Sequence, residues 1–240
     1  MDVNKNSYTI VFSIILIVVV AGLLAFVSET LKPLQKENER VEKMQNILES
    51  VGVQSSADEA GDMFDKYIVD QLLLNHKGEP IEINEITPFD LDVVQQSRAV
   101  DVEDRVYPLF IYEKDGDKKY IIPLAGKGLW GPIWGYVSFQ KDMSTIAGAS
   151  FDHSGETPGL GAEINTPAFQ NKFIDKMIFD DNEEFVSVIV RKGGTDVKGK
   201  IHEVDGISGG TITSRGVSDM LKNTLEVYIP YFKGDTSNAL

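Results

Sequence analysis

The first hydrophobic pattern in the chain is an uninterrupted apolar run near the N-terminus. Residues 7–27 read SYTIVFSIILIVVVAGLLAFV and contain no charged side chain. A helix of about 20 apolar residues is long enough to cross the hydrocarbon core of a bilayer. A cleavable signal peptide is the alternative, with Lys5 as a short basic region and small residues from Ala21 to Ala25. The length of the run favours a retained transmembrane helix, preceded by a tail at residues 1–6.

A helical connector is predicted after this run, over residues 28–66. Its apolar side chains recur at helical spacing among lysines and glutamates: Leu34, Val41, Met44, Leu48 and Val51. Such an amphipathic helix suits either a solvated stalk or a contact with a partner. Residues 52–56 interrupt the pattern, and Ser55 or Ser56 can cap a second, short helix over 57–66.

The middle of the chain is rich in short β-type runs that are separated by turn residues. The predicted strands cover residues 67–75, 105–114, 119–124, 133–140, 144–151, 185–191 and 200–204. The turn Asp115-Gly116-Asp117 between two of these strands is a strong hairpin signal. Consecutive hairpins predict an antiparallel sheet.

Two further helices are predicted from apolar side chains at helical spacing. The first covers residues 167–177, and the second covers 214–228 with Thr213 or Ser214 as its cap. Together with the hairpins, they predict an α+β fold in which an antiparallel sheet has flanking helices. This domain would occupy residues 67–232, followed by a tail at 233–240.

Composition and charge exclude several classes of function. The formal net charge is −14 and no Lys/Arg-rich stripe is present, so a nucleic-acid surface is not expected. The chain has no cysteine, which excludes disulfides, thiolate metal sites and cysteine nucleophiles. His76, His153 and His202 lie far apart without ligand spacing, so no metal site is expected. No catalytic triad or paired-carboxylate site is evident either, and the chemistry would therefore reside in a cofactor.

The most informative motif is Asp205-Gly206-Ile207-Ser208-Gly209-Gly210-Thr211, which runs into the last predicted helix. A glycine-rich turn at a helix N-terminus is suited to phosphate, because free N–H groups and the positive helix end both favour an anion. The hydroxyl group of Thr211 can itself be esterified by that phosphate. An ordinary turn with an N-cap hydroxyl is the alternative interpretation.

Two other glycine-rich segments precede this motif. In residues 125–135 the glycines allow close approach of the backbone to a flat molecule, and Leu129 and Trp130 offer apolar faces. The alternative is a tight turn between strands with Trp130 in the core. Residues 156–163, ETPGLGAE, lack the spacing of a dinucleotide fingerprint. As a loop, they can present N–H groups and Leu160 to the edge and face of a ring.

The motif at 205–211 resembles the flavinylation motif of the FMN-binding domain family, roughly D-G-x-[ST]-G-A-[ST]. In that family the last residue carries FMN through a phosphoester bond. Four motif positions match: Asp205, Gly206, Ser208 and Gly209. Thr211 falls on the acceptor position, and Gly210 stands where the family usually has alanine.

The three segments, in this order after an N-terminal anchor, resemble the C subunits of sodium-translocating NADH:quinone reductases from about residue 7 to 232. The homologous G subunits of Rnf-type ferredoxin:NAD oxidoreductases share the acceptor motif and are the alternative. The longer insert between anchor and sheet and the Leu129-Trp130-Gly131 segment favour the quinone reductases. A third hypothesis is an anchored module that binds a free phosphate ligand and carries no flavin.

The resemblance implies a flavoprotein subunit of a membrane enzyme, with no complete catalytic site of its own. A flavin transferase would attach FMN covalently to Thr211, and the other subunits of a six-subunit assembly would exchange electrons with it during sodium export. The resemblance and the loop chemistry together predict a set of cofactor-binding residues. These are Ser208, Gly209, Gly210, Ile212 and Thr213 for the phosphate, and Thr157, Leu160, Gly161, Leu129 and Trp130 for the ring.

The predicted location is the bacterial inner membrane, with a single span. The resemblance places the flavin domain on the periplasmic side. Basic side chains after the span favour the opposite orientation under the positive-inside rule: Lys32, Lys36, Arg40 and Lys43. The resemblance is given precedence, because long domains often override such a small charge bias.

Overall fold

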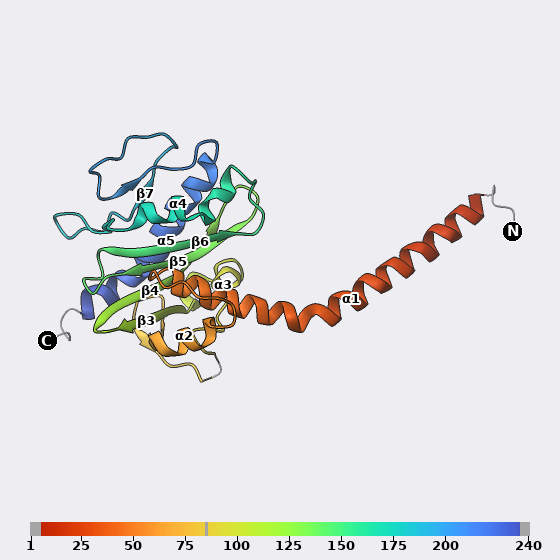
Figure 1. Cartoon of the computed structure of the whole chain (residues 1–240), viewed down its shortest axis with the longest axis horizontal. Helices are drawn as coiled ribbons and strands as arrows, with labels where there is room; N and C mark the ends of the chain where they lie inside the picture. Colours follow the sequence, from red (N-terminus) through yellow and green to blue (C-terminus); the bar gives the residue numbers. More distant parts are fainter. Residues whose placement is uncertain (1–5, 85, 236–240) are drawn as a thin grey trace. The chain divides into compact units, whose positions relative to one another are not determined.

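The computed structural model describes residues 6–84 and 86–235. The chain forms two compact units, Met1–Lys43 and Met44–Leu240. The first unit consists of most of helix α1 (Asn6–Glu49), which continues without a break from the apolar run into the polar stretch (Figure 1). An 18-residue part of this helix has a mean hydropathy of 3.2, so α1 is long and apolar enough to cross a membrane.

The second unit is built on a six-stranded antiparallel sheet with the order β2-β1-β3-β4-β5-β6. Its strands are β1 (Ile68–Leu74), β2 (Pro80–Ile81), β3 (Tyr107–Lys114), β4 (Asp117–Lys127), β5 (Pro132–Phe139) and β6 (Ile146–His153). The sheet and its flanking helices confirm the predicted α+β class. Along the chain, every step from β3 to β6 is a hairpin.

The hairpin between β3 and β4 follows the sequence signal. Asp115 and Gly116 have φ angles of 53° and 84°. Positive φ at both central residues is the geometry of a two-residue turn that matches the right-handed twist of the strands. Lys114 then pairs with Asp117, which fixes the register of the two strands.

One face of the sheet is covered by α5 (Thr211–Asp235), which runs across it and contacts β4 (Figure 1). Its side chains Val217, Leu221 and Leu225 are fully buried, in one cluster with Ile122 and Leu124 of β4. These two strand residues are separated by one position, as expected for side chains on the same face of a sheet.

The opposite face of the sheet is also covered. Phe64 of α2 (Ala60–Tyr67) packs edge-on against Phe110 of β3, with the ring centroids 6.3 Å apart. After the end of α1, the carbonyl oxygen of Ser50 accepts a hydrogen bond from the buried Ser138 hydroxyl of β5. Because both faces are covered, β3 is buried at five successive positions and shows no polar–apolar alternation.

The predicted helix over 167–177 is wrong beyond its first turn. The structure has α4 (Pro167–Gln170) and a 3₁₀ turn, η3 (Asn171–Phe173). The chain then reverses at Asp175, whose φ is 62° and whose N–H bonds to the Ile146 carbonyl at 2.9 Å. Phe169 and Phe173 pack on Phe151 of β6, so their apolar spacing reflects this cluster instead of a long helix.

Two other segments differ from the sequence prediction. The predicted strands over 185–191 and 200–204 shrink to β7 (Ile189–Val190) and β8 (Glu203–Val204), which pair in parallel. Before β3, the chain forms a helix that the hydrophobic pattern does not predict, α3 (Val93–Ala99). The Asp92 carboxylate caps it by accepting from the Gln95 N–H at 2.9 Å, a signal that the sequence does contain.

Candidate functional site

The motif at residues 205–211 forms a tight turn that leads directly into α5. Gly209 has a φ of 77°, and the Gly210 N–H bonds to the Ile207 carbonyl at 3.0 Å. The helix begins at Thr211, three residues before the predicted start. The first intrahelical bond runs from the Ser214 N–H to the Gly210 carbonyl, at 2.8 Å. Glycine in the left-handed region allows this turn to join the helix without a linker.

The two hydroxyl groups that the sequence predicts as helix caps have other partners. The Ser214 hydroxyl accepts a hydrogen bond from the Ile207 N–H at 3.1 Å. The Thr213 hydroxyl donates to the Glu156 carboxylate at 2.6 Å. The N–H groups of Thr211, Ile212 and Thr213 precede the first intrahelical bond, so the helix itself offers them no acceptor. This end of α5 therefore has the electrostatics of an anion site.

Exposure separates the residues of this first turn of α5. Thr211 is exposed and Ile212 is 58% exposed, whereas Thr213 is 1% exposed. Ser208 and Gly209 are also exposed, and Gly210 is buried. The hydroxyl group of Thr211 is therefore accessible for modification, while Thr213 anchors the turn from the inside.

The ETPGLGAE loop lies directly against this turn. A Cβ atom added to Gly209 would lie 2.6 Å from Cδ2 of Leu160, and one added to Gly210 would lie 3.3 Å from the Leu160 carbonyl carbon. Leu160 is 41% exposed and precedes a 3₁₀ helix, η2 (Gly161–Asn165). Thr157 is exposed, and its carbonyl accepts from the Leu160 N–H at 3.1 Å.

The loop between β4 and β5 carries the remaining predicted ring contacts. Leu129 is 48% exposed and Trp130 is 70% exposed. The alternative that Trp130 belongs to the core is therefore wrong. A hydrogen bond of 2.8 Å from the Gly128 N–H to the Gly131 carbonyl closes the loop. Both large side chains project from a constrained turn.

Glu156 connects this loop to the other two. Its Oε1 accepts from the Trp130 N–H at 2.9 Å, and its Oε2 accepts from the Thr213 hydroxyl at 2.6 Å. Its own N–H bonds to Nδ1 of His153 at 3.3 Å. The sequence patterns do not single out Glu156 as a site residue. A carboxylate at the start of a glycine-rich loop is the one signal that could have indicated it.

Asp205, the first residue of the 205–211 motif, holds neighbouring segments in place through hydrogen bonds. Asp205 Oδ1 accepts from the Thr195 N–H at 2.9 Å, and the Asp205 carbonyl accepts from the Lys172 ammonium at 3.0 Å. Gly206 packs so closely that an added Cβ would clash with the Arg191 carbonyl oxygen. The first half of the motif therefore fixes the turn against its neighbours and leaves the second half accessible.

A groove of about 920 Å³ borders the turn. It is lined by residues 185–192 and by the exposed face of α5, including Thr211, Ile212 and Arg215. Its volume is in the range of cavities that hold cofactors. Among the described residues, no group of three or more His, Asp or Glu side chains could hold a metal ion.

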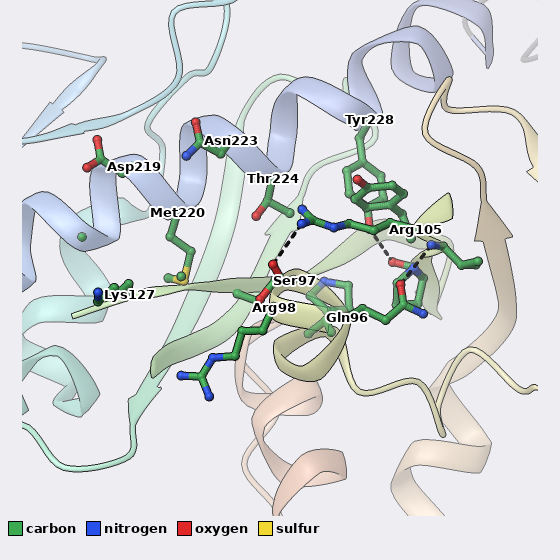
Figure 2. Close-up of a pocket in the computed structure, with 18 residues that line it drawn as sticks. Gln96, Ser97, Arg98, Arg105, Lys127, Asp219, Met220, Asn223, Thr224 and Tyr228 are labelled. Carbon is green, nitrogen blue, oxygen red and sulfur yellow. Dashed lines mark hydrogen bonds between the residues drawn. The ribbon is translucent and has the colours of Figure 1, made fainter. Parts of the chain in front are cut away.

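A second cavity, of about 430 Å³, lies between α3, β4 and α5 (Figure 2). Arg105 crosses it and donates to the carbonyls of Ser97 and Val100, both at 2.9 Å, at the C-terminal end of α3. Figure 2 shows Arg98 pointing away from Arg105. The Arg105 guanidinium thus serves as a C-terminal cap of α3.

Comparisons with known proteins identify the family of this chain. The model of the FMN-binding domain family matches residues 128–226, which include all three loops. The C subunit of the Na(+)-translocating NADH-quinone reductase of Vibrio vulnificus is 33% identical over 201 residues, covering 78% of each chain. The corresponding subunit of Haemophilus ducreyi is 29% identical over 252 residues, covering 96% of each chain.

Solved structures give the same result. The crystal structure of the Na(+)-translocating NADH-quinone reductase C subunit from Parabacteroides distasonis has a TM-score of 0.75 and 46% identity, covering 84% of this chain and 96% of that one. Shewanella oneidensis NqrC has a TM-score of 0.68 and 27% identity, covering 82% and 99%. The chain therefore belongs to the family formed by the C subunits of Na(+)-translocating NADH-quinone reductases.

Proposed function

We propose that this chain is the membrane-anchored flavoprotein subunit of a sodium-translocating NADH:quinone reductase, with FMN held covalently as a phosphoester on Thr211. The observation that carries the proposal is the position of Thr211. Its side chain is exposed at the first residue of α5, directly after a glycine turn. A phosphate esterified there lies next to N–H groups that the helix leaves without acceptors.

The surrounding side chains support a flat apolar ligand beside this phosphate site. Leu129, Trp130, Leu160 and Ile212 are each at least 41% exposed. Large apolar side chains gathered at the surface usually mark a binding surface. Leu160 adjoins the glycine turn, and the Trp130 loop is held to the same helix through Glu156. These links support a ring site formed by Leu160 and the Trp130 loop near the first turn of α5.

Different residues of the chain would hold the phosphate and the ring of the cofactor. Ser208, Gly209 and Gly210 give the phosphate close access to the backbone, and the N–H groups of Ile212 and Thr213 offset its charge. Thr157, Leu160 and Gly161 form one side of the ring site. FMN, when bound, supplies one-electron transfer chemistry.

Attachment of the phosphate requires help from outside the chain. Among the described residues, no His, Asp or Glu side chain forms a hydrogen bond with the Thr211 hydroxyl, so no general base is positioned on it. A flavin transferase would supply the activation. An exposed acceptor hydroxyl on a tight turn is accessible to such a separate enzyme.

The proposed partners are the other subunits of a six-subunit membrane complex, which pass electrons from NADH to quinone while sodium is exported. We place the protein in the bacterial inner membrane, anchored by residues 7–27 as a single span, with the flavin domain on the periplasmic side. The relatives and solved structures described above are C subunits of quinone reductases. They favour this assignment over the G subunit of an Rnf-type complex.

Mass spectrometry tests the attachment directly. Trypsin is expected to release residues 201–215, which contain Thr211. When the chain is co-expressed with the transferase, this peptide should carry the mass of FMN less one water, and fragmentation should localise the mass to Thr211. An unmodified peptide from a yellow, active complex would contradict the proposal. A protein band that fluoresces under ultraviolet light after denaturing electrophoresis would exclude the module that only binds free phosphate.

Substitutions at the turn provide the control. Thr211→Ala should abolish covalent flavin and leave the fold intact, because an exposed helix-terminal hydroxyl contributes about 1 kcal/mol or less. Thr211→Ser keeps a hydroxyl and should restore some loading.

A further inference from the structure

Glu156 is unusual among the charged residues of this protein. Of the residues that the structure describes, it is the only charged side chain in the buried set, with 5% of it exposed. Burying a carboxylate carries a large free-energy penalty unless hydrogen bonds replace its hydration. Both of its oxygens accept such bonds, from two different segments. The Glu156 carboxylate therefore joins the Trp130 loop to the first turn of α5.

The glycines around Glu156 support this interpretation. A Cβ atom on Gly128 would clash with Oε1, and a Cβ atom on Gly161 would clash with Oε2. Neither glycine has a positive φ, so backbone conformation does not explain its presence. The close approach of the Glu156 carboxylate explains why both positions are glycine. Two glycine-rich segments are therefore shaped around one side chain.

The carboxylate connects the two ends of the proposed flavin site. Trp130 lies in the loop that would contact the ring, and Thr213 lies in the first turn of α5, two residues after Thr211. The Thr213 side chain is buried while that of Thr211 is exposed, so the two point to different sides of the turn. The α5 partner of Glu156 is the Thr213 hydroxyl, and its effect on the acceptor position would pass through that bond.

We propose that Glu156 is a positioning residue, which fixes the Trp130 loop relative to the first turn of α5 and thereby sets the flavin ring against Trp130. The inference rests on the proposed attachment of FMN to Thr211. A single side chain with two acceptor oxygens holds both donors at a fixed separation. Without it, the Trp130 loop loses its side-chain link to the first turn of α5.

The side-chain chemistry distinguishes three substitutions. Glu156→Ala removes both bonds. Thr213→Val removes only the bond to α5 and keeps a side chain of similar shape. Glu156→Gln can keep both links, since its carbonyl oxygen accepts from the Trp130 N–H and its amide donates to the Thr213 hydroxyl. Geometry therefore predicts that Gln rescues what Ala loses.

The experiment uses the full-length chain, co-expressed with a flavin transferase and purified in detergent. Flavin fluorescence is measured in the native and in the denatured protein, and the flavin midpoint potential is measured by redox titration. Denatured fluorescence reports covalent loading alone. Native fluorescence reports contact with Trp130, because a neighbouring indole quenches a flavin.

Glu156→Ala and Thr213→Val should load flavin but show native fluorescence that rises toward the denatured value, together with a shifted midpoint potential. Glu156→Gln should keep the quenching of the parent chain. Glu163→Gln is the matched control: Glu163 lies in the same loop and its carboxylate accepts a local bond, from the Gly159 N–H at 3.0 Å. It should match the parent in all three measurements.

Two results would overturn parts of this account separately. Loaded Glu156→Ala and Thr213→Val proteins with parent quenching and potential would show that Glu156 has only a structural role. If Glu156→Ala does not fold, Thr213→Val carries the same test, because it leaves Glu156 and the Trp130 bond in place. A parent chain without fluorescence after denaturation would instead contradict the proposed attachment to Thr211.

Discussion

The hydroxyl group of Tyr228 donates a hydrogen bond of 2.8 Å to the carbonyl oxygen of Pro108. The bond ties α5 to the start of β3, and Tyr228 is fully buried. Burial raises the pKa of Tyr228 well above its usual range, so the hydroxyl remains a donor at neutral and alkaline pH. This contact holds the far end of the helix whose first residue is Thr211.

Tyr228→Phe should therefore lower the free energy of unfolding by about 1–2 kcal/mol, because it leaves a buried carbonyl without its donor. Urea unfolding of the detergent-solubilised chain measures the effect. Tyr120→Phe is the control, since Tyr120 is also buried and its hydroxyl makes no hydrogen bond to a described residue. Equal effects of the two substitutions would contradict the prediction.

Trp130→Ala and Leu160→Ala should alter the flavin without unfolding the protein. The two side chains are 70% and 41% exposed, so truncation removes little core packing and should change stability by about 0.5 kcal/mol or less. Thr211 should stay flavinylated, while the flavin spectrum, fluorescence or midpoint potential shifts and electron flow slows. Thermal melts and redox titration on the same variants distinguish a flavin contact from a packing role. Large losses of stability with unchanged flavin signals would indicate a packing role.

The two central glycines of the turn should differ in their tolerance of alanine. At Gly209 the φ is 77° and an added Cβ would lie 2.6 Å from Leu160, so Gly209→Ala should cost about 1–2 kcal/mol and reduce flavin loading. At Gly210 the φ is not positive and the nearest atom, in Ile207, lies at 3.0 Å. Gly210→Ala should load flavin like the parent. Denatured-protein fluorescence compares the two, and the reverse order would refute the account of the turn.

The ion pair between Glu203 and Arg191 predicts a pH dependence of stability. The hydrogen bond from Arg191, at 2.7 Å, lowers the pKa of Glu203 from 4.5 to about 2, and Lys200 at 3.1 Å adds to the effect. Because the folded-state pKa is depressed, the pair stabilises the fold above the unfolded-state value and loses this contribution as the pH falls toward 2.

Glu203→Gln should therefore lower the melting temperature at pH 7, and its difference from the parent should shrink below pH 4.5. Melts of both proteins across this range check the sign. Glu226→Gln, at an exposed position of α5, is the control and should show no such trend. A difference that grows as the pH falls would contradict the assignment.

Topology remains a prediction with two opposing indications. A periplasmic reporter enzyme fused after the last residue should be active if the flavin domain lies outside. Activity only from a cytoplasmic reporter would show that the basic residues after the span set the orientation. Replacing Lys32 and Lys36 with glutamine should leave the reporter result unchanged if the large domain overrides the charge bias.

The sequence alone determined the features that depend on local chemistry. The apolar run near the N-terminus is a single long helix, and Asp115-Gly116 makes the predicted hairpin turn, because each needs only neighbouring residues to specify it. Apolar spacing misled where side chains pack on distant partners. Phe169 and Phe173 suggested a long helix, but they serve a cluster with Phe151.

Only the tertiary structure decided how the three glycine-rich segments meet. Glu156 accepts hydrogen bonds from Trp130, 26 positions earlier, and from Thr213, 57 positions later. No local pattern specifies such pairs, because they depend on the sheet placing the β4–β5 loop beside the first turn of α5. The sequence by itself supplied the acceptor threonine and its glycine turn. The packing of strands and helix placed one buried carboxylate between that turn and an exposed tryptophan.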